Sequence, residues 1–174
     1  SPESPAAVVV ENDNIAVSGI EISVNTDVSS VEVVVEALVS RPSSIGSPED
    51  VVVFQYLDVS TSLDEEEIDE ASISFYVTQT WLDQNDVDSE TIQLLRYDGS
   101  WTQLDTSFTS QEENLYYYDA VSPGFSYFAI VGEEGSDPEL SADEAPEEEE
   151  GESPETAAEK EETSAMYVFL ISAF

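Results

Sequence analysis

The sequence predicts an all-β protein: an antiparallel, immunoglobulin-like β-sandwich, followed by a disordered or extended acidic linker and a C-terminal apolar strand. Short runs rich in β-branched and aromatic residues fill residues 1–132, and several alternate apolar and polar residues with the period of two that is typical of strands. Turn residues separate the runs, and no long helical pattern lies between them to form the crossovers of a parallel sheet. These observations favour antiparallel sheets in a single sandwich domain, residues 1–132.

The expected strands follow one another at short intervals. Asp98-Gly99 gives the sharpest hairpin signal, because glycine readily adopts the positive φ that a tight turn requires. One short helix is expected within residues 80–90. The expected strands are 7–10, 15–24, 31–39, 51–59, 71–77, 91–97, 101–104, 114–120 and 125–131.

The composition changes after Gly132. Residues 133–163 are mostly Glu, Ser, Pro and Ala, which predicts an extended, self-repelling acidic linker. Residues 164–174 are apolar but too few for a membrane span, which needs about 20 residues. As a strand this tail is largely apolar on both faces, so we expect it to be buried on both sides, as a central strand is.

The charge restricts the classes of partner. The chain has 40 acidic and three basic residues, a net charge of -37. Nucleic acid and anionic membrane surfaces are therefore excluded as expected partners. Self-repulsion at this density destabilises the compact state in dilute salt, which indicates a salt-adapted, halophilic protein.

No catalytic machinery is visible in the sequence. The chain has neither histidine nor cysteine, which removes the commonest general base as well as disulfides and thiolate metal sites. Paired carboxylates of the glycosidase type are compatible with the composition, but no other catalytic signature accompanies them. We therefore predict that the protein is not an enzyme and has no small-molecule substrate.

One segment offers candidate metal ligands. Residues 83–90 carry oxygen ligands at the close spacing of a calcium loop, yet the glycine at position six and the glutamate at position twelve of an EF-hand are missing. A solvated helix cap or turn is the favoured interpretation. We expect no cofactor, with calcium at this segment as the one alternative. The candidate calcium ligands are Asp83, Asn85, Asp86, Asp88 and Glu90.

Four aromatic residues and one arginine are expected to be structural. Trp81, Trp101, Phe125 and Phe128 could line a glycan-binding surface, but packing in the core or at a sandwich corner is the more frequent role. Arg96 is one of three cations in the chain, and we expect a carboxylate to pair with it. The acidic run 64–70 is expected to be a solvated edge.

The middle of the chain resembles a known family. Residues 73–106 contain F-x-V, W-L, an acidic turn, L-x-R-Y, W and L-x-T, and residues 118–131 contain A-x-S-P-G-F-S-x-F-A-I. This pattern is similar to the PGF-pre-PGF domain of archaeal cell-surface proteins, over residues 71–132. The resemblance implies an exported archaeal surface protein with a β-rich ectodomain and no known catalytic role. Family members commonly continue through a low-complexity linker into a C-terminal membrane anchor.

The tail and the linker lead to a functional hypothesis. We expect a non-catalytic structural subunit of an archaeal extracellular filament or sheath, in which the tail of one subunit inserts into the next and joins copies head to tail. Such donation would also cover an exposed sheet edge. The candidate donor strand comprises Met166, Tyr167, Val168, Phe169, Leu170 and Ile171.

Three alternatives remain open from the sequence. The tail could fold back into its own domain. The chain could be a monomeric adhesin or surface-layer module whose C-terminus is a truncated membrane anchor, attached to the cell envelope. It could also be an enzyme accessory or carbohydrate-binding module, which a concave aromatic face with a bound cation would favour. The family resemblance implies an extracellular location at the cell surface.

Overall fold

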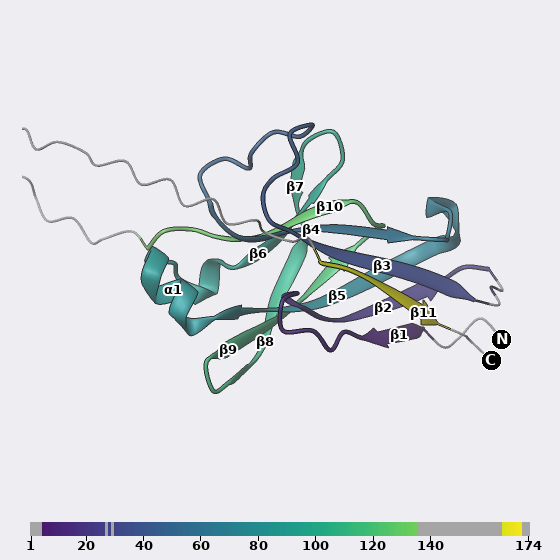
Figure 1. The fold of residues 1–174 in the computed structure, drawn as a ribbon, viewed down its shortest axis with the longest axis horizontal. Helices are drawn as coiled ribbons and strands as arrows, with labels where there is room; N and C mark the ends of the chain where they lie inside the picture. Colours follow the sequence, from purple (N-terminus) through teal and green to yellow (C-terminus); the bar gives the residue numbers. More distant parts are fainter. Residues whose placement is uncertain (1–4, 27, 29, 136–164, 172–174) are drawn as a thin grey trace, which may run out of the picture.

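Antiparallel strands form two sheets in the computed structural model, which describes residues 5–26, 28, 30–135 and 165–171. The sheets pack against each other around one shared core, so the protein is a β-sandwich, as the sequence predicts (Figure 1). In β3 alternate residues turn inward, and Val31, Val33 and Val35 are fully buried.

The first sheet, sheet A, has five strands. Its central pairs join strands that are far apart in the chain, because β2 pairs with β5 and β5 pairs with β9. Its order is β1 (Ala6–Val9), β2 (Val17–Val24), β5 (Ile68–Thr78), β9 (Leu115–Ser122) and β8 (Asp105–Glu112).

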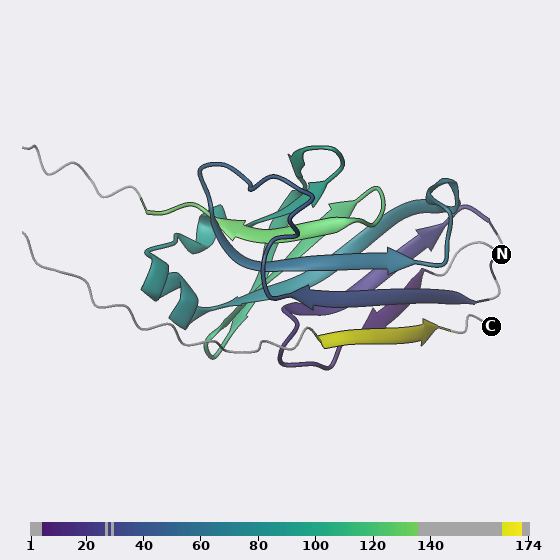
Figure 2. The same cartoon turned by 45° about the horizontal axis from the view of Figure 1, so that its top comes forward.

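The second sheet, sheet B, has six strands, and the last strand of the chain lies at one end of it. Figure 2 shows this strand, β11, in yellow beside β3. The order of sheet B is β11 (Ala165–Ile171), β3 (Val31–Leu38), β4 (Val52–Thr61), β10 (Tyr127–Gly132), β6 (Gln93–Tyr97) and β7 (Trp101–Gln103).

The core between the sheets is aliphatic with a few aromatic rings. Phe75 of sheet A stacks on Tyr118 with 5.6 Å between ring centroids, and Phe128 of sheet B is fully buried. Burial of each large apolar side chain of this kind stabilises the fold by roughly 1.5–3 kcal/mol. Other fully buried side chains are Ile15, Ile22, Leu57, Ile73, Leu94 and Ile130.

The short helical segments lie at the sandwich ends. Helix α1 (Gln79–Asn85) begins where the Thr78 hydroxyl accepts a hydrogen bond from the Trp81 backbone N–H at 3.2 Å. It ends at Asp86, which has the left-handed φ of 52°. The helix expected within 80–90 is therefore shorter, and the rest of that range contains the 3-10 turn η2 (Ser89–Thr91); a second one, η1 (Glu65–Glu67), precedes β5.

The predicted hairpin and the predicted strands mostly appear in the structure. β6 and β7 pair around the turn at Asp98-Gly99, where Gly99 has a φ of 74°. One strand was not predicted: β8 pairs along β9, although its sequence, Asp-Thr-Ser-Phe-Thr-Ser-Gln-Glu, is mostly polar. As an edge strand it is held chiefly by backbone hydrogen bonds, which leave little trace in side-chain composition.

Candidate assembly edge and surface groove

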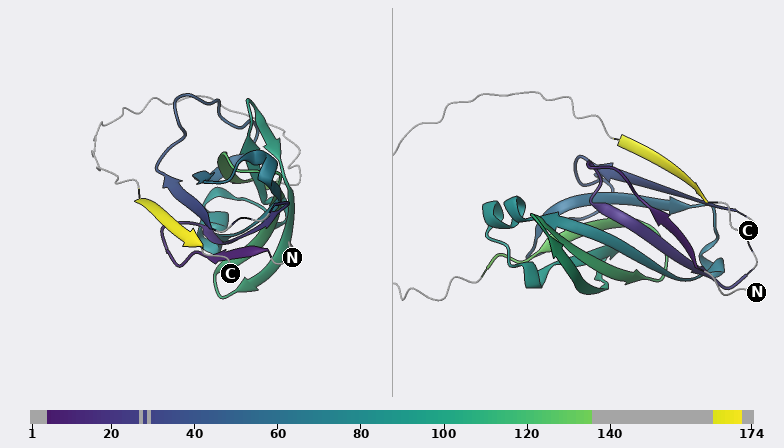
Figure 3. Two further views of the ribbon diagram at one scale, coloured as in Figure 1. Left: turned by 90° about the vertical axis from the view of Figure 1, so that its right-hand side faces the viewer. Right: turned by 90° about the horizontal axis from the view of Figure 1, so that it is seen from below.

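The outer edge of β3 receives the C-terminal strand. β11 pairs antiparallel with β3 over seven residues, from Ala165 opposite Ala37 to Ile171 opposite Val31. The ladder supplies backbone hydrogen bonds to an edge of sheet B that would otherwise lie open. Figure 3 shows β11 against the side of the sandwich that is also formed by β1, the end strand of sheet A.

The position of β11 differs from the expectation of a central strand. It takes an end position, paired along one side only. The reason is topological. The strands β4, β10 and β6 are each paired on both sides, so among the described strands only β3 and β7 offer an open edge in sheet B. An added strand can therefore join only at an end.

Arg96 forms the ion pairs expected for it. Its side chain is 13% exposed, and its guanidinium lies 3.2 Å from Glu65 Oε1 and 3.5 Å from Asp98 Oδ2. Glu65 belongs to the acidic run at η1, so Arg96 ties that turn to β6. Arg96 has a structural role and does not form an anion site, because its guanidinium is already paired with two carboxylates.

The side chains of the candidate calcium segment bond within helix α1 and at the start of η2. Asp88 Oδ1 accepts from the Glu90 backbone N–H at 2.9 Å, and Asp83 accepts from Gln79 Nε2 at 2.7 Å. The Asn85 amide donates to the Trp81 carbonyl at 2.9 Å. Among the described residues, no group of three or more Asp or Glu side chains is placed to hold a metal ion.

The four aromatic residues separate into different environments. Phe128 is in the core, while Trp81 packs at its margin, 5.0 Å from the ring of Phe54. Phe125 is half-buried and lines a small hollow near β4. Only Trp101 contributes to the outer face of sheet B, so these residues do not form one aromatic surface.

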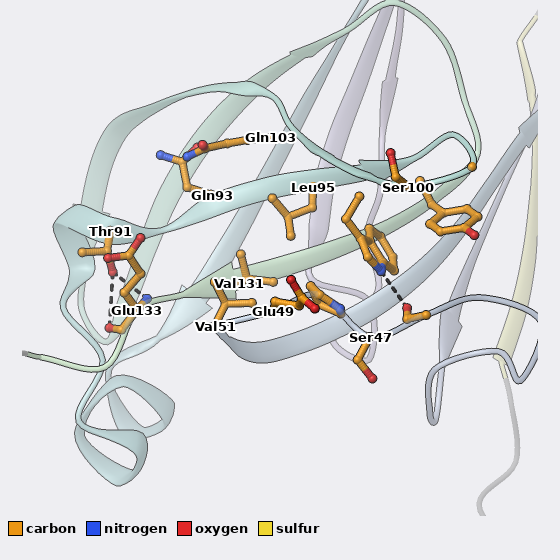
Figure 4. A pocket seen from close by; sticks show the side chains of 15 residues that line it. Ser47, Glu49, Val51, Thr91, Gln93, Leu95, Ser100, Gln103, Val131 and Glu133 are labelled. Atoms are coloured by element: carbon orange, nitrogen blue, oxygen red, sulfur yellow. Dashed lines mark hydrogen bonds between the residues drawn. The ribbon is translucent and has the colours of Figure 1, made fainter.

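A groove of about 530 Å³ lies on that outer face (Figure 4). Its floor comes from the residues of β6 that alternate with buried Leu94, and from their partners on β7. Its rim is the segment before β4. The main lining residues are Gln93, Leu95, Tyr97, Trp101, Gln103 and Glu49.

The rim of the groove is tied to the floor by a hydrogen bond. The Trp101 indole N–H donates to the Gly46 carbonyl at 2.7 Å, which joins floor and rim. Within the rim loop, the Arg41 guanidinium donates to the Ile45 carbonyl. The Trp101 ring also contacts Tyr97, with centroids 5.2 Å apart. The rim and the floor of the groove are therefore joined at Trp101.

The sequence contained a signal for this groove. Gln93, Leu95 and Tyr97 alternate along one strand, and Trp101 and Gln103 alternate along the next, on either side of the Asp98-Gly99 turn. In a hairpin, such residues share one face. The segment 46–51 at the rim could not be placed from the sequence, since it has no periodicity.

Comparison of the chain with protein-family models, curated proteins and solved structures yields no match. The resemblance to the PGF-pre-PGF domain therefore stays a prediction. Within the described residues, no helix is long and apolar enough to span a membrane.

Proposed function

We propose that this immunoglobulin-like β-sandwich is a non-catalytic structural subunit of an extracellular filament or sheath at an archaeal cell surface. In the assembly, β11 of one subunit pairs with β3 of its neighbour. The observation that carries the proposal is the seven-residue ladder between β3 and a strand at the far end of the chain. A strand that completes a sheet edge in this way is the unit of strand donation.

The chain between the two partners is long enough for exchange between subunits. Residues 136–164 separate Gly135 from β11, and a segment of 29 residues reaches at most roughly 95 Å when extended. The ladder contains the same backbone bonds whether β3 belongs to the same subunit or to the next one. Donation without closure joins subunits head to tail into a filament.

Effective concentration decides between the two pairings. A strand tethered to its own domain meets its own β3 at a local concentration in the millimolar range for short flexible linkers, and less for longer ones. Pairing between subunits becomes favourable when the concentration of neighbouring subunits is comparable to this local concentration, as on a crowded cell surface. High salt favours it too, because it screens repulsion between chains with a net charge of -37.

A second candidate function follows from the same ladder. β11 pairs with β3 of its own chain in this structure, as it would in a monomeric adhesin or surface-layer module. In that case the strand closes the sheet edge of its own subunit. Attachment to the cell envelope would then depend on another contact.

The test compares the full-length protein with a chain that ends at Thr163, both in high salt and over a range of concentrations. Negative-stain microscopy and sedimentation velocity report assembly. Filaments or growing oligomers from the full-length chain alone support donation. A full-length chain that stays monomeric at every concentration, with residues 31–38 protected from hydrogen exchange, selects the monomeric module.

A further inference from the structure

We infer that the groove over β6 and β7 binds a neutral saccharide chain. The observation is an aromatic floor flanked by two side-chain amides, on a protein surface that is otherwise strongly acidic. Its volume of about 530 Å³ is in the range of roughly 300–1,000 Å³ that is usual for ligand pockets.

The aromatic part of the groove is held by ring contacts and a hydrogen bond. Trp101 contacts Tyr97 and Tyr56, with ring centroids 5.2 and 6.1 Å away, and its N–H is already bonded to Gly46. What the indole offers to a ligand is therefore its apolar ring surface, which remains partly exposed. Aromatic rings of this kind pack against the C–H faces of sugar rings at a low cost in side-chain entropy.

The polar part of the groove is made of amides and hydroxyls. Figure 4 shows Gln93 and Gln103 close to each other, beyond Leu95, from neighbouring strands. Each amide both donates and accepts hydrogen bonds. Sugar hydroxyls do the same, so one ligand hydroxyl can accept from an amide nitrogen while donating to an amide oxygen.

The charge of the lining excludes anionic ligands. Glu49 and Glu133 line the groove, and none of its described lining residues is Lys or Arg. A sulfated, phosphorylated or uronic acid ligand would meet carboxylates without any compensating cation. The occupant is therefore a neutral chain, such as a hexose or N-acetylhexosamine oligomer.

The fluorescence of Trp101 provides a direct assay. The chain has two tryptophans, and the substitution Trp81→Phe leaves Trp101 as the only one. The probes are cellohexaose, maltohexaose, mannohexaose and chitohexaose, added to the full-length variant and excited where tyrosine does not absorb. We expect a saturable change in Trp101 emission with at least one of them, and calorimetry on the unsubstituted protein then gives the affinity.

Matched variants locate the binding. Gln93→Ala combined with Gln103→Ala is expected to weaken binding by about tenfold or more, since two ligand hydrogen bonds are lost. The control is Gln111→Ala, an exposed glutamine of β8 on the other sheet, which should leave the affinity unchanged. Near-ultraviolet circular dichroism checks that the double variant keeps its packing.

Any of three results would overturn the inference. One is the absence of any saturable change with all four neutral probes. Another is a double variant that binds the neutral probes with unchanged affinity. The inference also fails if the protein binds heparin or hyaluronan and none of the neutral probes. The outcome is independent of whether the protein assembles through β11, because the groove lies at the β7 end of sheet B and the ladder at the β3 end.

Discussion

Asp58 of β4 lies directly opposite Glu36 of β3 in the antiparallel register of sheet B. Burial raises the pKa of Asp58, and the negative charge of Glu36 raises it further by a smaller amount. Like charges opposite each other across a strand pair oppose pairing. This pair lies on the strand that receives β11, since Glu36 is also opposite Met166.

The substitution Asp58→Asn should stabilise the protein at pH 7 in low salt, by up to about 1 kcal/mol, because the site is partly exposed. The folded-state pKa of Asp58 is raised, so ionising it costs stability above that pKa, and the cost disappears as the pH falls through the unfolded value near 3.9. Urea unfolding at pH 7 and pH 3.5 should show a difference that closes at the lower pH. Asp69→Asn, at an exposed position of β5, is the control and should have a smaller effect.

Gly132→Ala should destabilise the fold by roughly 1–3 kcal/mol, as overpacking does. A Cβ at this position would collide with Val87 Cγ1 and lie 2.9 Å from Ile92 Cδ1, both buried. Gly46→Ala is the matched control, because nothing lies within 4 Å of its Cβ position. Thermal unfolding of the two variants should separate them, and equal melting temperatures would show that the chain around β10 adjusts freely.

Tyr118→Phe should lower stability at neutral pH by about 1 kcal/mol, since it removes the 2.7 Å hydrogen bond to the Ser89 carbonyl. Burial also raises the pKa of Tyr118. The neutral phenol is therefore the folded form, and its contribution is complete below the unfolded pKa near 10 and is lost as the pH rises further. The variant should lose less stability than the parent between pH 9 and 12. Tyr127→Phe, the same substitution at another half-buried position, is the matched control variant.

Local signals predicted most of the sandwich. Asp98-Gly99 marks its hairpin because the required φ is a property of one residue. The alternation in β3 marks both a strand and its buried face, since one side of the strand meets the core. The pairing of Arg96 was predictable because the chain has only three cations among 40 acidic residues.

Other features depend on long-range packing and were not predictable. β8 is a strand because β9 is beside it, whereas its own residues, apart from Phe108, are polar or small. The apolar composition of β11 suggested a central place, and the order of strands left only an end. The groove required the rim at Gly46 to meet Trp101, 55 residues away in the chain.

Proline within β11 should open the edge of β3. Alternate residues of an edge strand donate backbone hydrogen bonds to their partner, so either Val168→Pro or Phe169→Pro removes a ladder bond directly. In the variant that loses a ladder bond, the backbone amides of residues 31–38 should exchange faster, and the protein should not assemble. Glu161→Pro, outside the strand, is the control. Unchanged exchange in both variants would mean that β11 does not cover β3 in solution.

Shortening the chain before β11 should drive assembly. Deletion of residues 138–162 leaves four residues between Gly135 and Ala165, a reach of at most roughly 13 Å. That is too short to return from β10 to β11 across β4 and β3, so β11 can then pair only with another subunit. At a fixed concentration in high salt, sedimentation velocity should then show a larger share of oligomers than for the full-length protein. The same deletion combined with both Val168→Pro and Phe169→Pro should stay monomeric. If the shortened chain is monomeric, the strand does not pair with another subunit, and the filament proposal fails.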